Sequence, residues 1–113
     1  MSHFRIYIPT RTLFGAGMVK ELHNQQLPGK KAMIVTDKVM IDLGNCAKVE
    51  NALKSQGVEY TIYSEIAGEP TDVMIEKGLA QYKAERCDFL VALGGGSVID
   101  TSKAVAHGTA NPD

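Results

Sequence analysis

Three consecutive glycines, Gly94, Gly95 and Gly96, directly follow the apolar run at residues 88–93, and helix-forming residues begin at once with Ser97. Three glycines in succession need a reason, because each costs about 0.5–1 kcal/mol relative to alanine inside a regular element. Without Cβ atoms they let backbone N–H groups approach a ligand, and the helix behind them aims its positive end at the same point. The spacing predicts a phosphate-binding loop. The alternative is a tight strand-to-helix turn that binds nothing.

The glycine loop differs from the standard phosphate motifs. The third glycine of the dinucleotide fingerprint would fall at position 99, where the chain has Ile99, and no Lys-Ser or Lys-Thr pair is placed for a P-loop. The residues therefore predict a mononucleotide or dinucleotide site and leave the identity of the ligand open.

Asp37 follows a second apolar run, at residues 31–36. A carboxylate at the end of such a strand can accept hydrogen bonds from the two hydroxyls of an adenine ribose, which is a device that selects NAD. The alternative is that Asp37 is the N-cap of a helix that starts at Lys38.

The residues just after the glycines have two interpretations. Ser97-x-x-Asp100 is typical of a capping box, and Lys103 follows Asp100 at ion-pair spacing. Contact with the ligand is the other role that we consider for Asp100 and Lys103.

The elements that must position these residues alternate along the chain. Period-two alternation predicts a half-buried strand at residues 4–8, and a further strand is expected at 58–63. The runs at 31–36 and 88–93 are typical of strands buried on both faces. Helical segments follow, the one after Asp37 broken at Gly44-Asn45. The order predicts an α/β fold, a Rossmann-like parallel sheet with helices on both faces and the N-terminal strand or hairpin at the edge.

The composition is that of an ordinary globular domain. Of the 113 residues, 44% are hydrophobic and 22% are charged, and the formal net charge is −1. The spread of Lys and Arg argues against a nucleic-acid partner, and no apolar run approaches the roughly 18 residues of a membrane span. Cys46 and Cys87 lack metal-type spacing, and the histidines have no partner ligands. We expect buried thiols, no metal site and a cytoplasmic domain.

Four stretches of the chain, taken together, resemble a known family. They are GGGSVIDTSKAVA at 94–106, IYIPTRTLFGAGMVKEL at 6–22, AMIVTDK at 32–38 and EPT at 69–71. In order and spacing they resemble the N-terminal region of the iron-containing (group III) alcohol dehydrogenases. Dehydroquinate synthases and glycerol dehydrogenases are relatives of that family, but Ser97 after the glycines is similar to the alcohol dehydrogenase branch.

The resemblance implies that residues 1–113 are a dinucleotide-binding domain, a fragment from which the family's helical metal-binding domain is absent. It implies NAD as the cofactor, with NADP less favoured. Within the loop that Gly94 opens, Gly95, Gly96 and Ser97 would contact the pyrophosphate, Asp37 the adenine ribose, and Glu69, Pro70 and Thr71 the adenine region. The Fe²⁺ or Zn²⁺ of the parent would be held by one Asp and three His of the second domain.

The parent would transfer hydride between a small alcohol or aldehyde and the nicotinamide, with a homodimer as a possible assembly. This chain would hold cofactor-binding residues and no catalytic ones, and alone it is expected to be inactive. The competing hypothesis is a non-catalytic nucleotide- or phosphosugar-binding α/β module, which shares the glycine loop but gives no role to Asp37.

Overall fold

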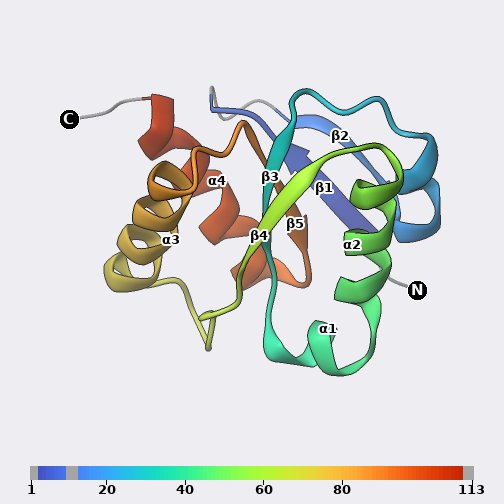
Figure 1. Ribbon diagram of the computed structural model, residues 1–113. Coiled ribbons are helices and arrows are strands. Elements are labelled where there is room, and N and C mark those ends of the chain that lie inside the picture. Colours follow the sequence, from blue (N-terminus) through green and yellow to red (C-terminus); the bar gives the residue numbers. More distant parts are fainter. Residues whose placement is uncertain (1–2, 10–12, 111–113) are drawn as a thin grey trace.

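The computed structural model describes residues 3–9 and 13–110, which fold into one five-stranded sheet covered by helices (Figure 1). In chain order the elements are β1 (His3–Tyr7), β2 (Leu13–Met18), the 3-10 helix η1 (Val19–Asn24), β3 (Lys31–Val35), α1 (Lys38–Asp42), α2 (Asn45–Ser55), β4 (Glu59–Tyr63), α3 (Asp72–Ala84), β5 (Phe89–Leu93) and α4 (Gly96–Ala110).

The strand order in the sheet is β2-β1-β5-β3-β4. β3 pairs in parallel with β4 and with β5, as expected of strands joined by helical crossovers. β1 is antiparallel to β5 and to β2, so the sheet is mixed and not parallel throughout. The predicted α/β fold with an N-terminal hairpin at the edge is confirmed, and β2 of that hairpin is one of the two edge strands.

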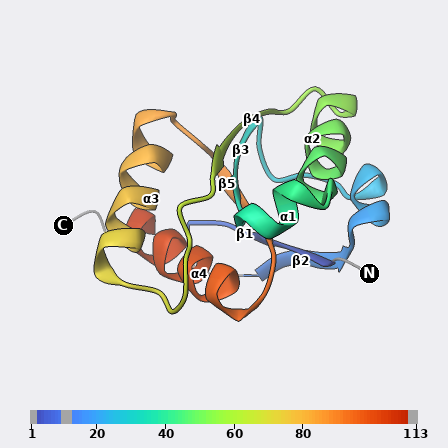
Figure 2. The same ribbon diagram turned by 90° about the horizontal axis from the view of Figure 1, so that it is seen from below.

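Side-chain alternation along the strands builds a separate core on each face of the sheet. On β5, Phe89, Val91 and Leu93 join the cluster under η1 and α2, whereas Leu90 and Ala92 join the cluster under α3 and α4. All five side chains are buried, which explains why the whole strand is apolar. The two layers of helices lie on opposite sides of the sheet in Figure 2.

The helix boundaries follow local chemistry. Gly44, with a φ of +82°, separates α1 from α2 at the predicted break. The helical segment after β2 is short and of the 3-10 type, and its start is fixed by Glu21, whose Oε1 accepts a hydrogen bond from the Met18 N–H at 2.7 Å. Over the described part of the chain, no helix has the length and apolar character needed to cross a membrane.

Candidate functional site

Three adjacent parallel strands, β5, β3 and β4, end at the same edge of the sheet, which is at the bottom of Figure 1. The glycines follow β5, Asp37 follows β3, and the connection that contains Glu69, Pro70 and Thr71 follows β4. In open α/β sheets, ligands bind outside the carboxyl ends of the strands. The topology thus brings all three predicted segments to the edge where a ligand would bind.

The three glycines fall into two kinds. Gly94 is required by the protein itself, because its φ is +147° and a Cβ there would lie 2.8 Å from Cγ2 of Val98. Gly95 and Gly96 have no positive φ, and a Cβ on either would meet no neighbouring part of the protein within 4 Å. A tight turn therefore explains Gly94 but not the other two. Both are exposed, so their backbones are open to a ligand.

The carboxylate of Asp37 has two oxygens in different surroundings. Oδ1 accepts a hydrogen bond from the Met40 N–H at 2.9 Å, so Asp37 is the N-cap of α1, as one of the two interpretations predicts. Oδ2 is turned toward the glycine loop and lies 3.4 Å from the position that a Cβ of Gly94 would occupy. Capping therefore uses one oxygen and directs the other to the edge of the sheet.

Thr36 is a member of this edge that sequence reasoning missed. It is fully buried, its Oγ1 donates to the Leu93 carbonyl at 2.7 Å, and its N–H donates to the Tyr63 carbonyl at 3.0 Å. A polar residue at the end of the apolar run 31–36 was the available signal. Its partners, however, depend on the pairing of strands that are far apart in the chain.

Thr71 caps α3, since its Oγ1 accepts from the Met74 N–H at 3.2 Å. Glu69 is exposed, and Gly68 turns the chain before it with a φ of +68°. In both ribbon views the connection from β4 to α3 passes beside the start of α4. Glu69, Pro70 and Thr71 therefore lie on the side of the site where β4 ends, and their contact with a ligand stays a prediction.

The capping box predicted at Ser97 and Asp100 is wrong. α4 begins at Gly96 and the Ile99 N–H donates to the Gly95 carbonyl, so Ser97 is already helical and cannot be the N-cap. The glycines themselves form the start of the helix. Asp100 is exposed one turn further on, and the ion pairs that the described residues form do not join it to Lys103. Ligand contact by Ser97 or Asp100 stays a prediction.

No group of three His, Cys, Asp or Glu side chains within residues 3–9 and 13–110 is placed to hold a metal ion. Cys46 and Cys87 are free thiols buried on opposite faces of the sheet. Burial raises the pKa of each thiol to about 11, so both are protonated at neutral pH. Thiolate chemistry at neutral pH is therefore not available to them.

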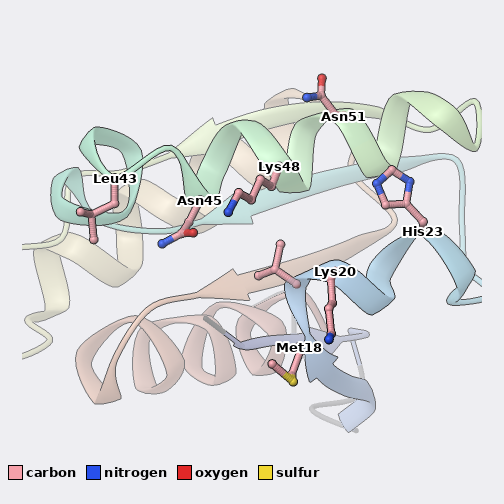
Figure 3. A pocket seen from close by; sticks show the side chains of 8 residues that line it. Met18, Lys20, His23, Leu43, Asn45, Lys48 and Asn51 are labelled. Carbon is pink, nitrogen blue, oxygen red and sulfur yellow. The ribbon is translucent and has the colours of Figure 1, made fainter. Parts of the chain in front are cut away.

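A cavity of about 640 Å³ lies between η1 and α2 (Figure 3). Leu43, Asn45, Lys48 and Asn51 line one wall, and Met18, Val19, Lys20 and His23 line the other. The Nδ1 of His23 is 3.3 Å from Oγ of Ser55, which donates to the Ala52 carbonyl. Because the Ser55 proton is thus engaged, this pair is not a nucleophile with its base.

Comparisons with known proteins agree with this arrangement. The sequence pattern of the family described as "Iron-containing alcohol dehydrogenase" matches residues 9–113. The chain is 36% identical to the NAD-dependent methanol dehydrogenase of Bacillus methanolicus over 107 residues, covering 93% of this chain and 28% of that protein. It is 33% identical to the lactaldehyde reductase of Escherichia coli K12 over 111 residues, covering 96% and 29%.

Solved structures give the same result for the fold. An archaeal halo-thermophilic alcohol dehydrogenase from a Red Sea brine pool superposes with a TM-score of 0.73 at 37% identity, covering 79% of this chain and 23% of that one. An iron-containing alcohol dehydrogenase of Thermococcus thioreducens gives a TM-score of 0.72 at 31% identity, covering 79% and 24%. The chain thus spans less than a third of the length of each of these relatives.

Proposed function

Because this chain belongs to the iron-containing alcohol dehydrogenase family, we propose that it is the nicotinamide-cofactor-binding part of an enzyme that transfers hydride between an alcohol and NAD. The observation that carries the proposal is the open space at Gly95 and Gly96. The fold does not require glycine at either position, whereas the close approach of a pyrophosphate does.

In this proposal, the residues at the edge where β5, β3 and β4 end each contact a different part of the cofactor. The backbone N–H groups of Gly95, Gly96 and Ser97 donate to the pyrophosphate, whose negative charge also interacts favourably with the N-terminal end of α4. Oδ2 of Asp37 accepts from the ribose hydroxyls, which favours NAD over NADP. Glu69, Pro70 and Thr71 border the adenine.

The parent enzyme supplies what this chain does not. Hydride transfer is the chemistry of the bound nicotinamide, and the described residues contain no group of three that could hold Fe²⁺ or Zn²⁺. We therefore assign no step through a metal to this chain. A small alcohol or aldehyde as substrate and assembly into a homodimer belong to the same proposal. A cytoplasmic location, which is consistent with the two free thiols, is also part of the proposal.

The experiment that tests this proposal is calorimetry with NAD on the unaltered chain and on Gly95→Val. The branched side chain meets no part of the protein but stands where the pyrophosphate must approach. We expect NAD affinity to fall at least about tenfold, a change of about 1.4 kcal/mol. The thermal midpoint should fall only slightly, because valine is a poorer residue than glycine at the start of α4.

Gly57→Ala is the matched control. Gly57 has a φ of +73° and lies just beyond the end of α2, so alanine there should cost about 1–2 kcal/mol of stability and leave NAD affinity unchanged. Equal NAD affinity in Gly95→Val and the unaltered chain would remove the phosphate loop and with it the proposed function.

A further inference from the structure

We infer that Thr36 is a positioning residue for cofactor selectivity, because its buried hydroxyl holds the carboxylate of Asp37 in register with the glycine loop. The inference rests on the proposed function, since it concerns the same nucleotide site. Thr36 itself is fully buried, so it acts through the segments that it joins and not by touching the ligand.

The contacts of Thr36 connect the ends of all three parallel strands. The residue directly follows β3, its hydroxyl donates to the carbonyl of Leu93, the last residue of β5, and its N–H donates to the carbonyl of Tyr63, the last residue of β4. The backbone pairing of β3 with β5 ends at Val35 and Ala92. The hydroxyl therefore adds a side-chain hydrogen bond just beyond the last backbone pair.

Leu93 and Thr36 each immediately precede a residue of the site. Leu93 is bonded to Gly94, and Thr36 is bonded to Asp37. The bond of 2.7 Å between Thr36 and Leu93 therefore fixes the separation between the carboxylate and the loop, which brings Oδ2 to 3.4 Å from the Cβ position of Gly94. The cap on Met40 fixes Oδ1, and this bond sets the direction in which Oδ2 faces.

This geometry matters for selectivity because the repulsion between a carboxylate and a 2′-phosphate depends on their separation. Rigid placement of Asp37 against the loop that holds the pyrophosphate makes that separation small and constant. Without the hydroxyl, the Leu93 carbonyl loses its buried donor, and the start of the loop is free to move relative to Asp37. NAD binding should then weaken and NADP should be rejected less strongly.

The test compares Thr36→Val and Thr36→Ser by calorimetry with NAD and with NADP, alongside thermal melts. Valine keeps the shape and the strand preference of threonine but lacks the hydroxyl, whereas serine keeps the hydroxyl. We expect the NAD-to-NADP affinity ratio to fall by about 2- to 10-fold in Thr36→Val, which is the range for loss of one hydrogen bond, and to stay at the unaltered value in Thr36→Ser.

Ser102→Ala is the control for loss of a buried hydroxyl. Ser102 is fully buried and its Oγ donates to the Val98 carbonyl at 2.8 Å within α4. Because this bond lies inside one helix, and alanine is a better helix former than serine, the substitution should change the thermal midpoint little and leave the ratio unchanged. A lowered midpoint with an unchanged ratio in Thr36→Val would overturn the inference and leave Thr36 a purely structural residue.

Two further outcomes are distinguishable. If Thr36→Val does not fold, Thr36→Ser decides, because a changed ratio despite the retained hydroxyl would overturn the inference. An unaltered chain that binds no NAD would contradict the proposed function itself, whereas NAD binding with a ratio insensitive to Thr36 contradicts this inference alone.

Discussion

The carboxylate of Asp37 caps a helix and leaves one oxygen facing the glycine loop. Its Oδ1 caps α1 through the Met40 N–H, and its Oδ2 accepts no hydrogen bond from the described residues. Cap and ribose acceptor are therefore not exclusive roles, although the sequence presents them as alternatives. An alanine substitution would remove both at once, and a side chain that still caps the helix is needed to separate them.

Asp37→Asn makes that separation, because asparagine is as good an N-cap as aspartate but carries no charge. At about 4 Å and an effective dielectric constant of about 20, two unit charges repel by about 4 kcal/mol, less where solvent screens them. We expect the parent to prefer NAD by about 10²- to 10³-fold, since each 1.4 kcal/mol is a factor of ten. Asp37→Asn should shrink this preference.

The measurement is the ratio of NAD to NADP affinity before and after the substitution, together with a thermal melt. The melt should be unchanged in Asp37→Asn and lowered in Asp37→Ala, which loses the cap at a cost of about 0.5–2 kcal/mol. A constant affinity ratio across all three proteins would leave Asp37 with the capping role alone.

The sequence identified some residues of the candidate site and missed others. The glycines and Asp37 stand out because their types are unusual after apolar runs, and the structure places them at one edge. The role of Ser97 could not be read in this way, since the helix starts two residues earlier than the capping pattern suggests. Thr36 was missed because its partner Leu93 is 57 residues away in the chain.

At the scale of elements, β3, β4 and β5 follow from the pattern of apolar residues. The position of β1 within the sheet does not follow from the sequence pattern. Its period-two alternation predicts a half-buried strand, but pairing with β5 brings together residues such as Ile6 and Val91, and no local pattern encodes that choice. The mixed sheet is therefore a result of long-range packing.

Two tyrosines lie where α3 packs on the sheet, and we expect removal of their hydroxyl groups to have opposite effects on stability. Tyr63 on β4 donates its hydroxyl to the Met74 carbonyl at 2.6 Å, whereas the buried hydroxyl of Tyr82 on α3 has no hydrogen-bond partner among the described residues. An unsatisfied buried hydroxyl costs about 1–3 kcal/mol. We expect Tyr82→Phe to raise the free energy of unfolding by about 1 kcal/mol and the matched Tyr63→Phe to lower it by about as much.

Urea titrations of these two variants measure the difference directly. The slope of unfolding free energy against urea should stay the same, since neither change alters the surface that unfolding exposes. Destabilisation by Tyr82→Phe of the same size as by Tyr63→Phe would mean that the Tyr82 hydroxyl is satisfied in solution.

At the scale of the whole molecule, buried thiols in both cores make the free energy of unfolding depend on pH in the same direction. Burial raises the pKa of Cys46 and of Cys87 from the usual 9.0 to about 11. The unfolded chain therefore loses these protons first as the pH rises, and the free energy of unfolding should fall from about pH 9 toward pH 11. Burial also raises the pKa of Tyr82, which acts in the same direction.

Urea midpoints at about pH 7 and about pH 10 test this dependence. The doubly substituted Cys46→Ala, Cys87→Ala chain should lose less stability between the two pH values than the unaltered chain. An equal loss in both proteins would show that the thiols are not the groups responsible.

A second prediction at this scale concerns activity. The chain spans less than a third of its relatives, and its described residues contain no group of three ligands for a metal. The chain alone, supplied with NAD, a primary alcohol and Fe²⁺ or Zn²⁺, should therefore bind the cofactor without reducing it. Absorbance of the reduced nicotinamide is the measurement, and turnover that a chelator abolishes would contradict the prediction.

The place of β5 determines the order in which the molecule can be assembled during synthesis. β5 follows the other four strands of this sheet in the chain, yet it lies between β1 and β3 in the sheet. The β1–β2 hairpin and the β3–β4 unit must therefore wait, each with an uncovered strand, until residue 93 has emerged. Because the glycine loop follows that strand directly, insertion of β5 joins the two parts of this five-stranded sheet and brings the loop beside Asp37 in the same event.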